Sequence, residues 1–147
     1  MAKNKADNMN SNATATTPEK KRIMVVDDRA RDSQLVKLAL ERTNNYIVKE
    51  ENHAKAALAT AEAFQPHLIL LDVMMPGIDG GELAAAFHAH PQLHAVPIVF
   101  LTAMVSKDEV DAGHGLVGGR PFLAKPVVLT EMIACLDRHL KGEPAAV

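Results

Sequence analysis

The sequence predicts a doubly wound α/β fold, in which helices cover both faces of an open sheet of five parallel strands. Short runs of consecutive apolar residues recur along the chain, and segments with apolar residues three or four positions apart lie between them. Consecutive apolar residues are typical of strands covered on both faces, whereas the wider spacing is typical of helices. Strands that alternate with helices form parallel sheets through right-handed crossovers.

The predicted strands are short. Four of them are apolar runs, and the second strand, which is more polar, is expected nearer an edge of the sheet. In chain order they are IMVV at 23–26, YIVKEE at 46–51, LILL at 68–71, IVFL at 98–101 and PFLA at 121–124.

A helix is predicted after each strand. Four helices are marked by apolar residues at helical spacing: Leu35, Leu38 and Ala39; Ala54, Ala57, Leu58 and Ala61; Leu83, Ala84 and Phe87; and Met132, Ile133, Leu136 and Leu140. The remaining helix, fourth in chain order, is expected within SKDEVDAGHG at 106–115, where Ser106 can cap the first turn. Gly113 and Gly115 should end this helix early.

Length and composition narrow the class of protein. The 147 residues suit one domain, and a net charge of −2 gives no reason to expect nucleic acid. Cys135, the single cysteine, cannot form an internal disulfide, and no apolar stretch reaches the roughly 20 residues that span a bilayer. We therefore expect a cytoplasmic protein without a membrane partner. Residues 1–20 are predicted to be a disordered tail, 21–142 the folded domain and 143–147 a C-terminal tail.

Polar side chains follow four of the predicted strands. Asp27 and Asp28 come after the first, Asp72 after the third, Thr102 after the fourth and Lys125 after the fifth. Each alone could cap a loop or end a strand. The carboxyl ends of parallel strands meet at one edge of the sheet, however, and ligand sites of doubly wound folds lie there. Together these residues therefore predict a functional site.

The three carboxylates favour a bound metal ion. Two carboxylates 4 Å apart repel by about 4 kcal/mol at an effective dielectric constant near 20, and a divalent cation relieves this repulsion. No histidine or cysteine directly follows an apolar strand run, so the available donors are oxygens. Oxygen donors favour Mg²⁺ over zinc, and a bound Mg²⁺ accepts phosphate oxygens as further ligands.

Four motifs carry a resemblance to a known family. DD after the first strand, DVMMPGIDG after the third, TA after the fourth and KP after the fifth resemble the receiver domain of bacterial two-component response regulators, over residues 21–141. The resemblance implies the flavodoxin-like (βα)5 fold. It also implies a signalling module rather than an enzyme, one that catalyses only its own phosphorylation and dephosphorylation.

The resemblance assigns roles to the strand-end residues. Asp72 is implied as the phosphoacceptor, which takes a phosphoryl group from a histidine kinase or a histidine phosphotransfer protein. Asp28, Asp72 and the backbone carbonyl of Met74 are implied as direct ligands of Mg²⁺, and Asp27 as a ligand through water. Lys125 is implied to neutralise charge on the phosphoryl oxygens.

Further residues match positions of the family's switch. Thr102 is expected to move its hydroxyl toward a phosphoryl oxygen, with the small Ala103 leaving room and the Phe122 ring swinging inward. The Lys125–Pro126 peptide bond resembles the family's cis bond. Met74 and Met104 flank the path of the attacking water in this family, so two apolar side chains there predict a persistent phosphoryl group.

The resemblance leaves the partners and the setting open. We expect a stand-alone receiver of the chemotaxis type or a phosphorelay shuttle, which signals through the face formed by its fourth helix, fifth strand and fifth helix, with phosphorylation-dependent homodimers as one outcome. The glycine-rich GHGLVGGRPF puts that face in doubt. A receiver fragment of a larger regulator or hybrid kinase is one alternative. A scaffold with an unused acidic site is another, and so is a Mg²⁺-dependent hydrolase, although such enzymes of the haloacid dehalogenase type need an acid where Met74 stands.

Overall fold

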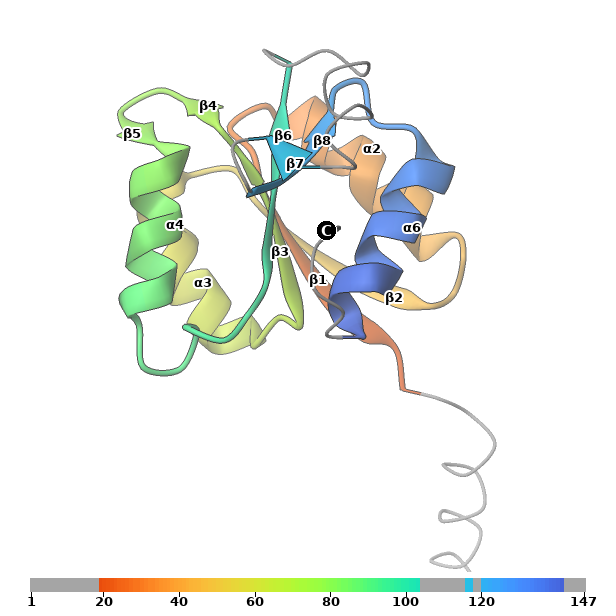
Figure 1. Cartoon of the computed structure of the whole chain (residues 1–147), viewed down its shortest axis with the longest axis horizontal. Helices are drawn as coiled ribbons and strands as arrows, with labels where there is room; N and C mark the ends of the chain where they lie inside the picture. The colour runs from red at the N-terminus through yellow and green to blue at the C-terminus, as the bar shows by residue number, and fades with distance from the viewer. Residues whose placement is uncertain (1–18, 104–115, 118–119, 142–147) are drawn as a thin grey trace, which may run out of the picture.

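A computed structural model describes residues 19–103, 116–117 and 120–141, and it contains the predicted sheet (Figure 1). Five parallel strands lie in the order β2-β1-β3-β6-β8. Their bounds are Lys21–Val26 for β1, Tyr46–Glu51 for β2, Leu68–Asp72 for β3, Ile98–Thr102 for β6 and Arg120–Ala124 for β8. The predicted fold class and all five predicted strands are therefore confirmed, including the position of β2 at an edge of the sheet.

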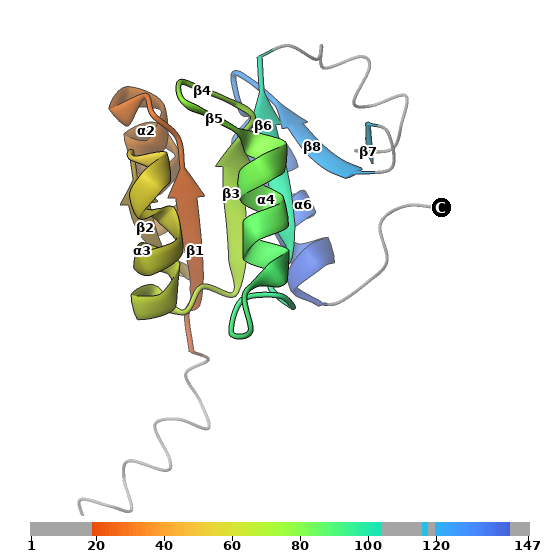
Figure 2. The same cartoon turned by 90° about the vertical axis from the view of Figure 1, so that its left-hand side faces the viewer.

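Helices cover both faces of the sheet, as Figures 1 and 2 show. The helices α2 and α6 pack on one face, and α3 and α4 pack on the other. Their bounds are Ala30–Glu41 for α2, Ala57–Phe64 for α3, preceded by the 3₁₀ turn η1 at Ala54–Ala56, Gly80–Ala89 for α4 and Leu129–Leu140 for α6. The helix predicted within 106–115 lies outside the described residues.

The sheet has one strand that the sequence did not predict. Strand β7 (Leu116–Val117) pairs antiparallel with β8 at the edge opposite β2. A two-residue strand is too short to leave a periodic pattern in the sequence. None of the described helices has both the length and the apolar character that crossing a bilayer requires.

The core consists of two clusters, one on each face of the sheet. Alternate side chains of β1 point to opposite clusters: Ile23 and Val25 pack beneath α2 and α6, and Met24 and Val26 beneath α3 and α4. The helix expected around Leu35 and Leu38 is present as α2, but these two leucines are 60% and 48% exposed. The buried face of α2 is instead Ser33, Val36 and Leu40.

The connection from β3 to α4 is a tight hairpin beside the end of β3. Strands β4 (Met74–Met75) and β5 (Ile78–Asp79) pair antiparallel, and Gly77 at the turn has φ +84°, a conformation that favours glycine. The chain therefore reverses direction at Pro76 and Gly77. Asp79 then caps α4 by accepting a hydrogen bond from the Gly81 N–H at 2.8 Å.

Gly80, the first residue of α4, packs directly against the backbone that carries Asp72. A Cβ at Gly80 would lie 2.8 Å from the Val73 Cα and 3.0 Å from the Asp72 carbonyl oxygen, whereas a Cβ at Gly81 would meet its first neighbour at 3.5 Å. We expect Gly80→Ala to lower the free energy of unfolding by roughly 1–3 kcal/mol, because neither backbone can give way without strain. Urea denaturation measures this loss. Gly81→Ala is the control, and a loss as large as that of Gly80→Ala would contradict the close approach.

Candidate functional site

The carboxyl ends of β1 and β3 place three carboxylates together. Asp27 follows β1 and is fully buried, Asp28 beside it is exposed, and Asp72 ends β3 with 4% of its surface exposed. The strands end level with one another, since Val26 pairs with Leu71. One oxygen from each carboxylate lies within 4.8 Å of one from each of the others. The convergence expected from the sequence is therefore present in the structure.

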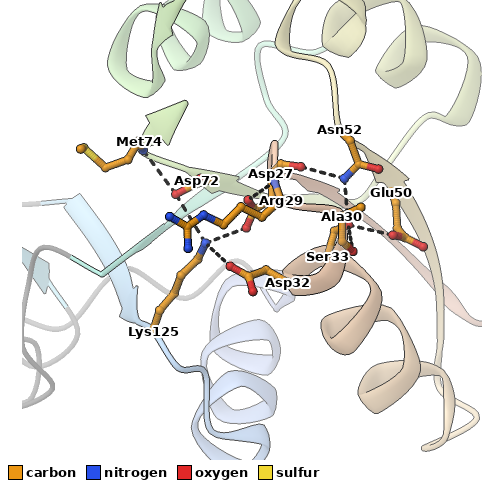
Figure 3. A network of polar contacts seen from close by, with 10 residues as sticks. All are labelled: Asp27, Arg29, Ala30, Asp32, Ser33, Glu50, Asn52, Asp72, Met74 and Lys125. Carbon is orange, nitrogen blue, oxygen red and sulfur yellow. Dashed lines mark hydrogen bonds and ion pairs between the residues drawn. The ribbon is translucent and has the colours of Figure 1, made fainter. Parts of the chain in front are cut away.

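Lys125 brings a positive charge to the same place (Figure 3). Its Nζ donates hydrogen bonds to Asp27 Oδ2 at 2.7 Å and to Asp32 Oδ2 at 3.1 Å, and it lies 3.7 Å from Asp72 Oδ1. The Lys125 N–H donates to the Thr102 carbonyl at 2.9 Å, which ties the lysine to the end of β6. The Lys125–Pro126 bond is cis, as expected from the resemblance.

Burial and charge set the ionisation of Asp72. Burial, and next the charge of Asp27, raise the pKa of Asp72 to about 6, although Lys125 and the Met74 N–H oppose this rise. The Met74 N–H lies 3.3 Å from Asp72 Oδ1. Burial alone would lower the pKa of Lys125, but hydrogen bonds to Asp27 and Asp32 outweigh it and the pKa is raised. Lys125 therefore stays charged, while burial and the neighbouring charge of Asp27 make Asp72 harder to ionise.

The donor set fits a hard divalent cation. The clustered groups are carboxylates, and the described residues place no histidine or cysteine among them. Burial is the largest cause of the raised pKa of Asp72, and the second is the charge of Asp27, which a bound cation would offset. Oxygen donors and excess negative charge are the conditions under which proteins hold Mg²⁺.

The residues expected to act as a switch lie at the ends of β6 and β8. Thr102 is 1% exposed, and Ala103 beside it is exposed. The Phe122 ring stacks on Phe100, with centroids 5.1 Å apart, so it is partly buried in the sheet layer. Met104 lies outside the described residues. The movements expected of Thr102 and Phe122 remain predictions.

Sequence reasoning missed the polar residues at the start of α2. Asp32 pairs with Lys125, and the Arg29 N–H donates to Asp27 Oδ1 at 3.0 Å. An acid in the first turn of a helix has an ordinary explanation in the helix dipole, and an arginine at a helix start has one in solvation, so neither residue type indicates a site. Only the spacing, five residues from Asp27 to Asp32 across a strand-to-helix turn, could have indicated that Asp32 faces the site.

A buried polar network holds this turn in place. The Asn52 side-chain amide donates to the Asp27 carbonyl at 2.7 Å and to Ser33 Oγ at 2.9 Å, and Ser33 Oγ donates to Glu50 Oε1 at 2.7 Å. These bonds connect the ends of β1 and β2 to the first turn of α2, as Figure 3 shows. They fix the backbone from which Asp27, Arg29 and Asp32 project.

Comparison with known proteins agrees with this fold and site. The family described as response regulator receiver domain matches residues 23–137. The chain therefore belongs to the response regulator receiver domain family, whose members are signalling modules of two-component systems.

Individual relatives have similar sequences and folds. The transcriptional regulatory protein ResD of Bacillus subtilis is 37% identical over 74% of this chain and 45% of its own length. Protein PilH of Pseudomonas aeruginosa is 28% identical over 82% of this chain and 98% of its own. The crystal structure of the chemotaxis response regulator CheY4 of Vibrio cholerae has a TM-score of 0.67 at 29% identity, covering 82% of this chain and 98% of that one. With ResD and two further regulators, the chain spans about half the length of the relative it matches.

Proposed function

We propose that the chain accepts a phosphoryl group on Asp72 in the presence of Mg²⁺ and signals by binding other proteins in a phosphorylation-dependent way. The observation that supports this most directly is the convergence of Asp27, Asp28 and Asp72 around one point, with Lys125 reaching the same oxygens. The raised pKa of Asp72 adds support: burial is its largest cause, and the second is the charge of Asp27, which a metal would offset. In this proposal residues 21–142 form the receiver unit.

The residues can divide the chemistry among themselves. An Asp72 carboxylate oxygen attacks phosphorus, the bond from phosphorus to the donor breaks, and its electron pair leaves with the donor's nitrogen or oxygen. Asp28, Asp72 and the Met74 carbonyl would hold Mg²⁺ directly and Asp27 through water. When bound, Mg²⁺ supplies positive charge to the transferring oxygens. Lys125, hydrogen-bonded to Asp27, would also supply positive charge, and the Thr102 hydroxyl would bond the finished phosphoryl group.

An apolar surface beside the site fits a protein as the donor. Leu35 and Leu38 on α2 and Val128 and Leu129 at the start of α6 are exposed by 60%, 48%, 44% and 37%. Leu35 and Leu129 line a pocket of about 340 Å³ that reaches Lys125. Exposed apolar side chains next to a reacting group suit docking of a histidine kinase or a phosphotransfer protein better than a small-molecule donor.

The response would pass to another protein. PilH, a receiver relative matched over 98% of its length, supports a stand-alone role here. The candidate output face consists of β8, α6 and the fourth helix, and that helix lies outside the described residues. Homodimers on this face are one form that the output could take.

Intact mass measured after incubation with acetyl phosphate and Mg²⁺ tests the function. We expect one labile phosphoryl group per chain, and none when EDTA removes the metal. A scaffold would gain nothing under either condition, and a hydrolase would consume acetyl phosphate continuously without a labelled chain. Either of these two results would contradict the proposal.

A further inference from the structure

The positive charge of Lys125 is shared among more carboxylates than the family motifs account for. Its Nζ donates to Asp27 and Asp32 and lies farther, at 3.7 Å, from Asp72. An ammonium group has three N–H donors, so two of them are already engaged by carboxylates. Lys125 is thus drawn toward α2, and one donor remains for a phosphoryl oxygen on Asp72.

Asp32 also changes the charge balance of the site. Four carboxylates, those of Asp27, Asp28, Asp32 and Asp72, surround it, and the ammonium of Lys125 balances one of them. An incoming phosphoryl group adds further negative charge. Transfer to such a site needs cationic groups beyond the metal and one shared lysine, because like charges in a partly buried cluster repel strongly.

Arg29 is the cation placed to meet this need. Its backbone is held beside the cluster, since its N–H donates to Asp27 Oδ1 and its carbonyl accepts from the Asp32 N–H at 3.0 Å. Its side chain lines the same pocket as Asp32, Ala103 and Lys125. In the view of Figure 3 the Arg29 side chain points away from α2, toward the side on which Asp72 and Lys125 are drawn.

The Arg29 guanidinium is free to bind an anion. No carboxylate among the described residues forms an ion pair with it. Its planar array of N–H donors matches two oxygens of a phosphoryl group at once, which an ammonium cannot do. Arg29 is exposed and lines the same pocket as the small Ala103 and as Lys125, the cation that contacts Asp72.

We propose that Arg29 is a second cation, besides Lys125, that binds the phosphoryl group of this receiver. Asp32 is in this proposal a positioning residue: it engages Lys125 and adds negative charge, so the charge of Arg29 is needed as well. The inference rests on the proposed function. As Asp72 oxygen bonds to phosphorus and the donor's oxygen leaves with the electron pair of the broken bond, Arg29 donates hydrogen bonds to the phosphoryl oxygens and keeps all of its protons. Asp32 meanwhile holds Lys125 against Asp27.

The test compares Arg29→Gln with Arg31→Gln, using acetyl phosphate with Mg²⁺ in single-turnover phosphorylation of the full chain. Arg31 is an equally exposed arginine two residues along α2 that does not line the pocket. We expect Arg29→Gln to slow labelling roughly tenfold, the effect of losing one charge-assisted hydrogen bond, and Arg31→Gln to leave the rate unchanged. Arg29→Gln should also weaken binding of beryllofluoride, and Arg29→Lys should restore part of the rate.

A double-mutant cycle tests the part played by Asp32. In Asp32→Asn the lysine is released toward Asp72, so adding Arg29→Gln should slow labelling much less than it does in the wild type. Equal rates for Arg29→Gln and Arg31→Gln, in a wild type that does accept the phosphoryl group, would overturn this inference and leave the proposed function standing. A wild type that accepts none would overturn both. If Arg29→Gln slowed labelling tenfold both in the wild type and in Asp32→Asn, the role of Asp32 would be refuted.

Discussion

Asp72→Asn should accept no phosphoryl group from acetyl phosphate under any concentration of Mg²⁺. The amide of asparagine is a far weaker nucleophile than a carboxylate and cannot form the acyl phosphate. The side chain stays the same size, and the Met74 N–H keeps an oxygen to bind. Intact mass spectrometry under conditions that label the wild type measures the effect.

The control for this prediction is Asp137→Asn. Asp137 is an exposed carboxylate on α6 that accepts a hydrogen bond from the Tyr46 hydroxyl at 3.4 Å, far from the carboxylate cluster. The Asp137→Asn variant should be labelled at the same rate as the wild type. Labelling of Asp72→Asn at a comparable rate would show that another residue carries the phosphoryl group.

Asp72→Asn should also be more stable than the wild type when metal is absent. With a pKa of about 6 against 3.8 in the unfolded chain, folded Asp72 binds more protons between these values, so the stability that its protonated form contributes is lost as pH rises through 6. Each unit of pKa difference corresponds to about 1.4 kcal/mol, and partial solvent contact reduces the total. We therefore expect the free energy of unfolding of Asp72→Asn to exceed that of the wild type by about 2 kcal/mol at about pH 7.5. Urea denaturation in EDTA measures it, and the gain should vanish near pH 4.

Lys125→Met is the second variant with a large expected effect. Removing the ammonium leaves Asp27, which is fully buried, beside Asp72 without the cation that both contact. Breaking a buried ion pair from one side typically costs about 3 kcal/mol, and we expect a loss of this size near neutral pH in metal-free urea denaturation. Mg²⁺ should recover much of it, because a bound ion replaces the missing charge.

Lys37→Met provides the matched comparison. Lys37 pairs with Glu41 at 3.7 Å on the surface of α2, where both side chains are more than a third exposed, so its loss should cost less than about 1 kcal/mol. If Lys125→Met were no more damaging than Lys37→Met, the cluster would not depend on the lysine. The electrostatic description of the site would then be wrong.

Four of the five parallel strands could be predicted because each is an uninterrupted apolar run between helical layers, and the more polar β2 was expected at an edge. The buried face of α2 could not be predicted from the sequence. Leu35 and Leu38 have the spacing of a core stripe but are exposed, whereas Ser33 is buried and forms hydrogen bonds with Asn52 and Glu50. A buried serine in place of an apolar residue hides the true face of a helix from periodicity. The exposure of these leucines can be interpreted only from the structure, which places them beside the site.

The site could be predicted as far as strand ends define it. Five of its residues lie at or just after the carboxyl end of a parallel strand, so the topology alone brings them together: Asp27, Asp28, Asp72, Thr102 and Lys125. Asp32 and Arg29 enter from the start of a helix, where Asp32 accepts a hydrogen bond from Lys125 and the Arg29 backbone N–H donates to Asp27. No local sequence pattern encodes these contacts. Their part in the charge balance therefore emerges only from the structure.

The central claim, that one carboxylate at the mouth of the sheet carries the phosphoryl group, is tested most directly by locating that group. Borohydride reduces an acyl phosphate of aspartate to homoserine, which peptide mass spectrometry can place in the sequence. After treatment with acetyl phosphate and Mg²⁺, we predict homoserine at position 72 and nowhere else. Homoserine at position 27 or 28, or a labile phosphoryl group found on a histidine, would contradict this account.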